Sequence, residues 1–196
     1  MSHAQPGPGG AQYAGFREHY RLIPGVLNVE DRPFFLPRLD PASLTQVVPG
    51  QSTGVINPNL NIAMTVGANT ALGANGSAYA GQLSITAVPE ELAPAKLPDE
   101  LGRGSLITIQ PVGVTFSTPV PITFPNRDNL PPGAGTDLWS IDPKSGTWVI
   151  VGTGRVTPDG QFVETISGGI RVRKMAGMIL TTMIPQETAT AHRVRR

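Results

Sequence analysis

A chain of 196 residues with 39% hydrophobic and only 15% charged residues can bury one good core, and its low charge excludes disorder driven by charge repulsion. Glycine (23) and proline (20) are abundant, which suits many short strands joined by turns and excludes a helical protein, because both residues are costly inside helices. The absence of cysteine excludes disulfides, zinc-finger clusters and thiol catalysis. The net charge of +1 divides into −4 over residues 1–170 and +5 over residues 171–196.

The N-terminal part has no strong periodic pattern. Residues 1–15 are rich in Gly, Pro and Gln, which predicts a disordered leader, and they lack the basic and apolar regions of a secretory signal. Residues 16–53 mix charged groups with Phe34 and Phe35. They predict an extended arm that packs across another part of the protein.

Two segments then alternate between apolar and polar residues, as half-buried strands do. The first, "NLNIAMTV", places Leu60, Ile62, Met64 and Val66 on one face. The second, "AYAGQLSITAV", places Tyr79, Leu83 and Ile85 on one face and Gln82, Ser84 and Thr86 on the other. The loop "GANTALGANGS" between them consists of turn formers.

Residues 88–104 contain three prolines and predict a long loop with at most one helical turn. The next segment, "ITIQPVGVTFSTPVPITFPN", is β-rich but carries Pro119, Pro121 and Pro125 on nearly alternate positions. Proline lacks the N–H that a sheet ladder needs, so it favours edge strands and strand exits. This stretch therefore predicts a chain that crosses between sheets along an edge.

Residues 137–166 predict a three-stranded antiparallel meander, because the turn sequences "DPKSG" and "TPDGQ" separate three apolar runs. In all, seven to nine short strands are expected, with turns every 8 to 12 residues. The prediction is an all-β, antiparallel, Greek-key-like β-sandwich over residues 54–172, with a C-terminal β-meander and an extended N-terminal arm. Alternation ends after Val172, so residues 173–196 predict a poorly ordered basic tail, and the chain is expected to be a truncated or internal piece of a longer protein.

The proline-rich segment resembles the signature of the ZU-type domain of ankyrins, netrin receptors and zonula occludens proteins. The matching positions are Pro111, Gly113, Phe116, Pro119, Val120, Ile122, Phe124 and Pro125. "RPFFLPRLDP" and the tryptophan hairpins are also similar to segments of large modular bacterial surface or secreted proteins. "VGANTAL" (66–72), where the family has a proline and a glycine, departs from the pattern. The resemblance implies a non-catalytic β-sandwich, at the cell surface or outside the cell, that links or displays other domains.

Some relatives with this architecture cleave their own chain at His-Phe-Ser or His-Leu-Thr. Here Thr115 stands in the histidine place before Phe116, so no base activates the hydroxyl and self-cleavage is not expected. A hydrolase triad is not expected either, because His3, His19 and His192 lie in the leader, arm and tail. Four carboxylates could form a glycosidase pair: Asp137, Asp142, Asp159 and Glu164. Turn chemistry already explains Asp142 and Asp159, and Glu164 alternates outward.

Three groups of residues could form binding sites, and each also has a structural explanation. The loops "NRDN" (126–129) and "DPKSG" offer oxygen ligands for calcium but lack EF-hand spacing. Trp139 and Trp148 lie on adjacent hairpin strands and could form a platform for sugars or peptides, although core packing is the commoner role of such residues. The basic residues of the C-terminal stretch could contact nucleic acid or anionic lipid, but lack helical spacing: Arg171, Arg173, Lys174, Arg193, Arg195 and Arg196.

The sequence therefore predicts a structural or interaction module, a spacer, display or adhesion domain. Its partners are expected to be proteins or neighbouring domains, with no nucleic acid, no membrane span, no cofactor, no metal and no enzymatic activity. The longest apolar stretch, "MAGMILTTMI" (175–184), is about half the length that a membrane span needs. The alternative is a carbohydrate- or peptide-binding module that uses Trp139 and Trp148.

Overall fold

The computed structural model describes residues 5–6, 10–15, 22–29, 35–93, 97, 105–142, 145–170 and 178–183. Over these residues the protein is all-β, and its strand pairs are antiparallel. The strands are β1 (Gln5–Pro6), β2 (Gln12–Tyr13), β3 (Thr45–Gln46), β4 (Thr53–Asn57), β5 (Ile62–Val66), β6 (Ala71–Leu72), β7 (Gln82–Ala87), β8 (Ile107–Gln110), β9 (Thr115–Phe116), β10 (Ile122–Pro125), β11 (Gly135–Ile141), β12 (Trp148–Val156), β13 (Phe162–Thr165) and β14 (Met178–Met183). Two single turns of 3₁₀ helix complete the set, η2 (Pro41–Ser43) and η3 (Glu90–Leu92), and η3 fits the single turn expected within 88–104.

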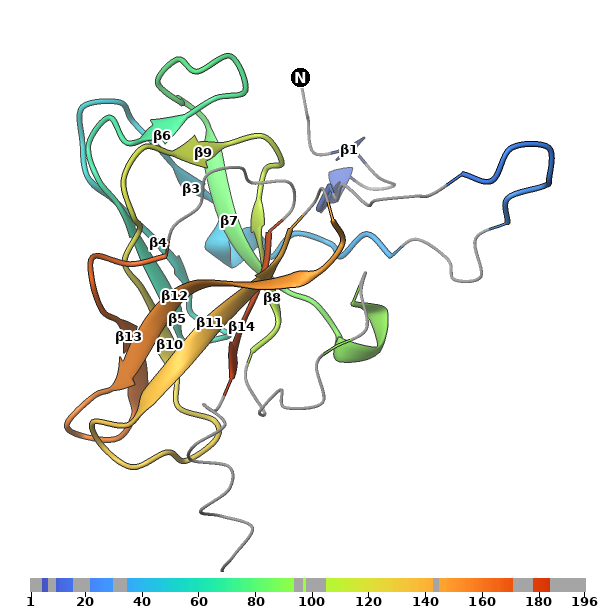
Figure 1. Ribbon diagram of the computed structural model, residues 1–196. Helices are drawn as coiled ribbons and strands as arrows, with labels where there is room; N and C mark the ends of the chain where they lie inside the picture. Colours follow the sequence, from blue (N-terminus) through green and yellow to red (C-terminus); the bar gives the residue numbers. More distant parts are fainter. Residues whose placement is uncertain are drawn as a thin grey trace, which may run out of the picture.

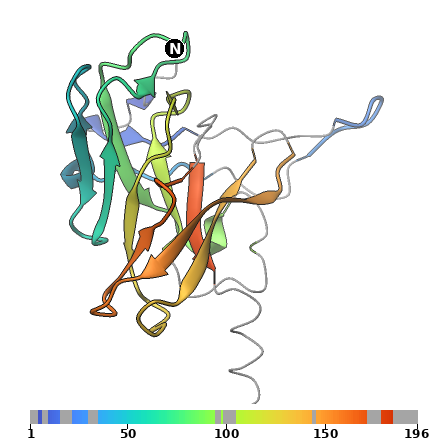
Figure 2. The same cartoon turned by 60° about the vertical axis from the view of Figure 1, so that its left-hand side comes forward.

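Ten strands form one hydrogen-bonded sheet in the order β3-β7-β8-β14-β11-β12-β13-β10-β5-β4. The sheet curls over so that β4, at one end, packs against β3 and β7, at the other, and the two halves face one another as in a sandwich (Figures 1 and 2). No ladder joins β4 to β3 or β7, so the sheet is not closed into a barrel.

The C-terminal half has the predicted topology. Strands β11, β12 and β13 form consecutive hairpins, which is the expected meander. Strand β10 then pairs with β13, so four strands lie in the order β11-β12-β13-β10, as in a Greek key. The two turns have the expected construction: Asp142 and Thr147 pair around the first, and Gly160 takes a positive φ of 75° in the second.

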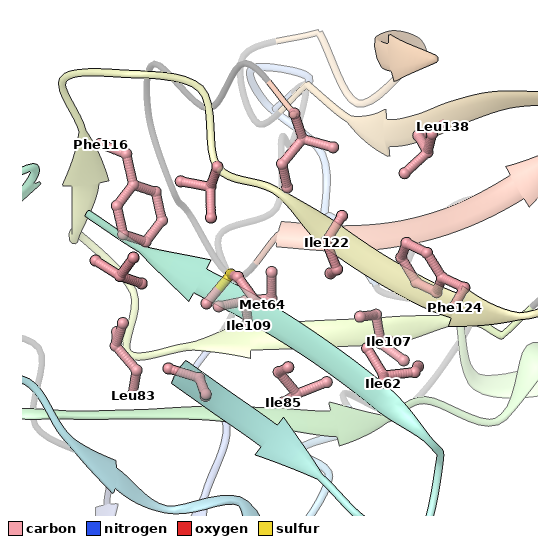
Figure 3. Close-up of a cluster of buried hydrophobic side chains, with 14 of the residues drawn as sticks. Ile62, Met64, Leu83, Ile85, Ile107, Ile109, Phe116, Ile122, Phe124 and Leu138 are labelled. Atoms are coloured by element: carbon pink, nitrogen blue, oxygen red, sulfur yellow. The ribbon is translucent and has the colours of Figure 1, made fainter. Parts of the chain in front are cut away.

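The core lies between the two halves, and alternation predicted its members well. Ile62, Met64 and Val66 are buried as expected, and so are Leu83 and Ile85. Figure 3 shows side chains of β5, β7, β8 and β10 meeting in this layer. The fully buried large side chains are Ile62, Met64, Leu83, Ile85, Ile107, Ile109, Ile122, Phe124, Leu138 and Ile170.

Strands β7 and β8 are buried on both faces, which alternation did not predict. Ser84 and Thr86 are buried although they point away from the core. The arm covers them: the Ile85 N–H donates to Ser43 Oγ (2.7 Å), and the Asp40 N–H donates to Thr86 Oγ1 (3.3 Å). The arm therefore adds a partial third layer over the sandwich.

The N-terminal segment joins the same layer. Ala14 donates to the Pro37 carbonyl and Leu39 donates to the Gln12 carbonyl, both at 2.8 Å. The Gln110 side chain, at the end of β8, exchanges two hydrogen bonds with the main chain of Gly15 (3.1 and 2.9 Å). Residues 11–15 are thus hydrogen-bonded to the folded unit, although composition assigned them to a disordered leader.

Hydrogen bonds of the Asn57 side chain join the two ends of the curled sheet, and we call these contacts, with Asp40, the polar seam. Asn57, fully buried at the end of β4, donates through Nδ2 to the Ile85 carbonyl (2.7 Å) and to Asp40 Oδ2 (3.1 Å). Its Oδ1 accepts from the N–H groups of Asn59 (3.0 Å) and Leu60 (3.1 Å). One side chain thereby links β4, β7, the turn before β5 and the residue that caps η2.

The prediction from the prolines was half right. The chain does cross between sheets here, because β9 pairs with β6 in a small two-stranded sheet whereas β10 belongs to the main sheet. The expected edge is wrong, since β10 lies between β5 and β13. Pro119 and Pro121 precede the strand and Pro125 is its last residue, so they border β10 rather than interrupt its centre.

The boundary predicted at Val172 is also wrong. Strand β14, from the stretch assigned to a poorly ordered tail, pairs with β8 on one side and β11 on the other. It connects the two halves of the ten-stranded sheet. The apolar sequence "MILTTM" is long enough for a strand, but its alternation is too weak to identify it as one.

Candidate interaction sites

The structure separates Asp142 from Asp159 and places Asp137 and Glu164 on the two strands that flank β12. Asp142 and Asp159 lie in the turns at opposite ends of β12, about 30 Å apart by strand length. Asp137 of β11 lies opposite Thr153 of β12, and Glu164 of β13 lies opposite Arg155 of β12. His3, His19 and His192 fall outside the described residues.

Asp159 has a structural role in its turn. Its Oδ1 accepts hydrogen bonds from the Thr157 hydroxyl and from the Gln161 N–H. These bonds, above all the one from Thr157, hold the pKa of the Asp159 carboxyl below its usual value. A carboxylate that is kept ionised by its own turn is suited to shaping that turn and poorly suited to acid catalysis.

The calcium candidates use their side chains internally. Asn126 Nδ2 donates to the carbonyls of Leu130 (2.8 Å) and Gly160 (2.9 Å), while its Oδ1 accepts from the Leu130 N–H (3.1 Å). The amide therefore joins two loops at one end of the sandwich. Within the ranges that the structure describes, no three or more acidic, His or Cys side chains form a group that could hold a metal ion.

Trp139 and Trp148 lie on one hairpin but do not face each other across it. Trp139 is opposite Ile150, and Trp148 is opposite Ile141. Trp148 packs with Ile141 against a second, smaller apolar cluster of Val88, Ala93 and Leu106. The indole N–H of Trp139 is buried without a hydrogen-bond partner, so the role of the pair as a ligand platform stays a prediction.

The other residues singled out from the sequence lie either in the β6–β9 pair or outside the described residues. Phe116 is buried in the core and pairs with Ala71, while Thr115 pairs with Leu72. The basic residues of the C-terminal stretch lie outside the described part of the chain, as do Pro143 and Lys144 of the first turn.

A different feature, which sequence reasoning missed, emerges from the arm. The pairing of residues 12–14 with residues 37–39 brings the two ends of a long excursion of the chain together. The described portion of that excursion, residues 22–29, projects away from the sandwich as the dark blue loop of Figure 1. We call residues 22–29 the finger tip, or the tip.

Local chemistry fixes the shape of the tip. Asn28 Oδ1 accepts from the Ile23 N–H (2.8 Å), and Asn28 Nδ2 donates to the carbonyls of Ile23 and Val26, both at 3.0 Å. Gly25 supplies a positive φ of 79° after Pro24. The tip is therefore a preformed turn rather than an unstructured stretch.

The tip exposes apolar side chains. Its exposed large hydrophobic residues are Leu22 (73%), Ile23 (59%), Val26 (56%), Leu27 (88%) and Val29 (70%). No residue between 22 and 29 is charged, whereas "FREHYR" precedes and "EDR" follows. This charge-free run, with Pro-Gly and Asn at turn positions, is the sequence signal that could have revealed the tip.

Other large hydrophobic residues are partly exposed on β12 and after β13. Val149 and Ile150 keep 38% and 53% of their surface exposed, and Ile166 after β13 keeps 36%. Val149 and Ile150 are consecutive in β12, so their side chains point to opposite faces of the sheet. They are single exposed hydrophobic residues, which are ordinary on protein surfaces.

Comparison with protein-family models, with curated proteins and with solved structures finds no match to this chain. Among the described residues, no helix is long and apolar enough to cross a membrane.

Proposed function

We propose that this chain is a non-catalytic structural and interaction module of the ZU type, a spacer, display or adhesion domain of a larger surface or secreted polypeptide. In this role the module remains folded between neighbouring domains, and its exposed surfaces contact protein partners.

One observation carries the spacer role. Strand β1 lies toward the upper end of the molecule, and strand β14 runs down toward the lower end (Figures 1 and 2). The first and last strands of the described residues thus reach opposite ends of the molecule. A module with this geometry separates its two neighbours by the length of its sheet.

The use of polar side chains supports the same proposal. Asn57, Ser43, Gln110 and Asn126 each make at least one hydrogen bond to the protein's own main chain. Such bonds stabilise one conformation, and they leave these groups committed to the fold. The apolar side chains left exposed at the finger tip suit contact with other proteins.

Mechanical unfolding tests the proposal directly. The chain has no cysteine, so one cysteine added at each end attaches handles for optical tweezers uniquely. A spacer should resist force and then unfold in one cooperative step. Gradual extension without a step would contradict the proposal, and so would hydrolysis of a glycoside substrate at a rate that Asp137→Asn or Glu164→Gln abolishes.

The alternative, a carbohydrate- or peptide-binding module, is favoured by the position of Trp139 and Trp148 on one face of a hairpin. It is weakened by the packing of Trp148 against the second apolar cluster. Titration with oligosaccharides would quench tryptophan fluorescence saturably if the alternative holds. No change in fluorescence up to millimolar sugar would leave the spacer role as the better account.

A further inference from the structure

Over its first part, β12 has a partner strand on one side only among the described residues. On the side away from β11, the contact with β13 ends where the Thr153 carbonyl accepts from the Ile166 N–H (2.9 Å). Ile170 covers the next position, since a Cβ on Gly152 would lie 3.3 Å from the Ile170 Cα. No described residue pairs with residues 149–151 on this side, and the start of β12 extends away from β13 (Figures 1 and 2). We call this side of the main chain of residues 149–151 the open edge.

The main chain of Ile150 faces the open edge. The Asp142 N–H donates to the Thr147 carbonyl (2.8 Å), so the main chain of Thr147 points toward β11. Main-chain groups point to the two sides of an antiparallel strand in turn. Those of Val149 therefore point to β11, where Val149 lies opposite Ser140. Ile150 presents its N–H and C=O groups on the other side.

The side chains along the open edge indicate which partner fits it. The segment "TWVIVGT" (147–153) contains no charged residue and no proline, two of the features that protect an edge from pairing. A strand added here would cover part of Val149 on one face and of Ile150 on the other, and it would desolvate no ionised group of this segment. A bulge at Val151 bends β12 just beyond Ile150, which limits the added strand to a short segment.

A row of main-chain N–H and C=O groups is matched most fully by another extended chain, which supplies the complementary groups at the same spacing. We infer that the open edge is a strand-addition site, which takes an uncharged, extended segment of a partner protein as an additional strand beside β12. This inference rests on the proposed function, because it names how the module holds a protein partner.

Amide NMR of the full chain, titrated with a short capped peptide of alternating threonine and valine, tests the inference. The peptide is uncharged, and both of its residue types favour strands. The Ile150 amide signal should shift saturably, and its hydrogen exchange should slow because the N–H becomes bonded to the peptide. The amide of Ile56 should not shift: its side chain is also 53% exposed, but its strand, β4, packs against β3 and β7.

Two proline variants and a modified peptide sharpen the test. Ile150→Pro removes the outward N–H and no ladder bond, so it should weaken peptide binding at least about tenfold with little change in melting temperature. Val149→Pro removes an N–H that points to β11, and it should lower the melting temperature clearly. The same peptide N-methylated at every residue keeps its side chains but has no N–H to donate, and it should not bind. This last control leaves the protein unchanged, so the test stands even where Ile150→Pro does not fold.

Three results would overturn the inference. The first is an Ile150 amide that does not respond to millimolar peptide, and the second is equal binding of the N-methylated peptide, which would indicate contact through side chains alone. The third is a dimer in sedimentation velocity whose Ile150 amide is already protected without peptide, which would identify a second copy as the occupant. None of these results would alter the single mechanical unfolding step, so failure of this inference is distinguishable from failure of the spacer role.

Discussion

The side chain of Asn57 makes the hydrogen bonds that join β4 to β7 in the polar seam. It is fully buried and makes four hydrogen bonds, two as donor and two as acceptor. This is the full capacity of an amide. Asn57 is therefore the residue whose loss should most weaken the closure of the curled sheet.

Asn57→Ala should lower the free energy of unfolding by about 2–4 kcal/mol, because it leaves the Ile85 carbonyl and two turn N–H groups without their partner. Urea denaturation followed by tryptophan fluorescence measures the change. Asn75→Ala is the matched control, since Asn75 makes its hydrogen bonds to Ser77 in an exposed loop. An equal loss in both variants would show that the seam has no special weight.

Asp40 gives the seam a dependence on pH. The Asn59 amide, and with it the Ala42 N–H and the Asn57 amide, holds the pKa of the Asp40 carboxyl below its usual value of 3.8, against the opposing effect of burial. The folded state therefore releases this proton more readily than the unfolded state does. The stabilisation is present above pH 3.8 and is lost as the pH falls through the folded pKa.

The free energy of unfolding should therefore fall as the pH is lowered below 3.8, and Asp40→Asn should make that fall shallower. Urea titrations at closely spaced pH values measure both slopes. Some dependence should persist in the variant, because the pKa of Asp159 is also lowered. An unchanged slope in Asp40→Asn would remove the seam from the acid response.

At the scale of elements, one close approach fixes how the chain enters β10. Val120 and Ile170 exchange two main-chain hydrogen bonds (3.0 and 2.9 Å). Gly169 beside this bridge has a φ of 118°, and a Cβ there would lie 2.1 Å from the Val120 carbonyl. Only glycine fits, because the conflicting atoms are backbone and cannot move aside.

Gly169→Ala should lower the melting temperature strongly, at a cost of about 3 kcal/mol or more in the free energy of unfolding. Gly135→Ala is the control, because its Cβ would meet nothing within 4 Å and its φ is not in the left-handed range. Differential scanning calorimetry compares the two. Similar melting temperatures for both variants would contradict the tight packing of the bridge.

Elements whose two faces differ were predictable from sequence. The alternation around Met64 and Leu83 reports burial on one side and solvent or loops on the other, and the turns at Asp142 and Asp159 follow from local side-chain chemistry. The burial of Ser84 and Thr86 was not predictable, because it depends on the arm that covers them. Proline restricts where it can lie within a strand, but it does not determine which strands pair with that strand on either side.

At the scale of the molecule, long-range pairing set the limit of prediction. The ZU-type resemblance and the strand count indicated an antiparallel all-β fold, yet neither indicated that residues 178–183 lie between β8 and β11. The candidate site behaved likewise. Trp139 and Trp148 were correctly predicted to lie on one hairpin. The finger tip was missed, because the exposure of its apolar side chains depends on the whole fold.

We expect the chain to unfold as a single cooperative module, because β14 joins the two parts of one sheet. Removal of β14 would separate the strands β3, β7 and β8 from the rest of the ladder and leave β8 and β11 with an unpaired edge each. The decisive experiment is thermal unfolding, by circular dichroism and tryptophan fluorescence together, of chains ending at residues 196, 183 and 172. The first two should melt in the same sharp, coincident transition, and the third should lose it. A chain ending at residue 172 that melts as sharply, and at the same temperature, would contradict this account.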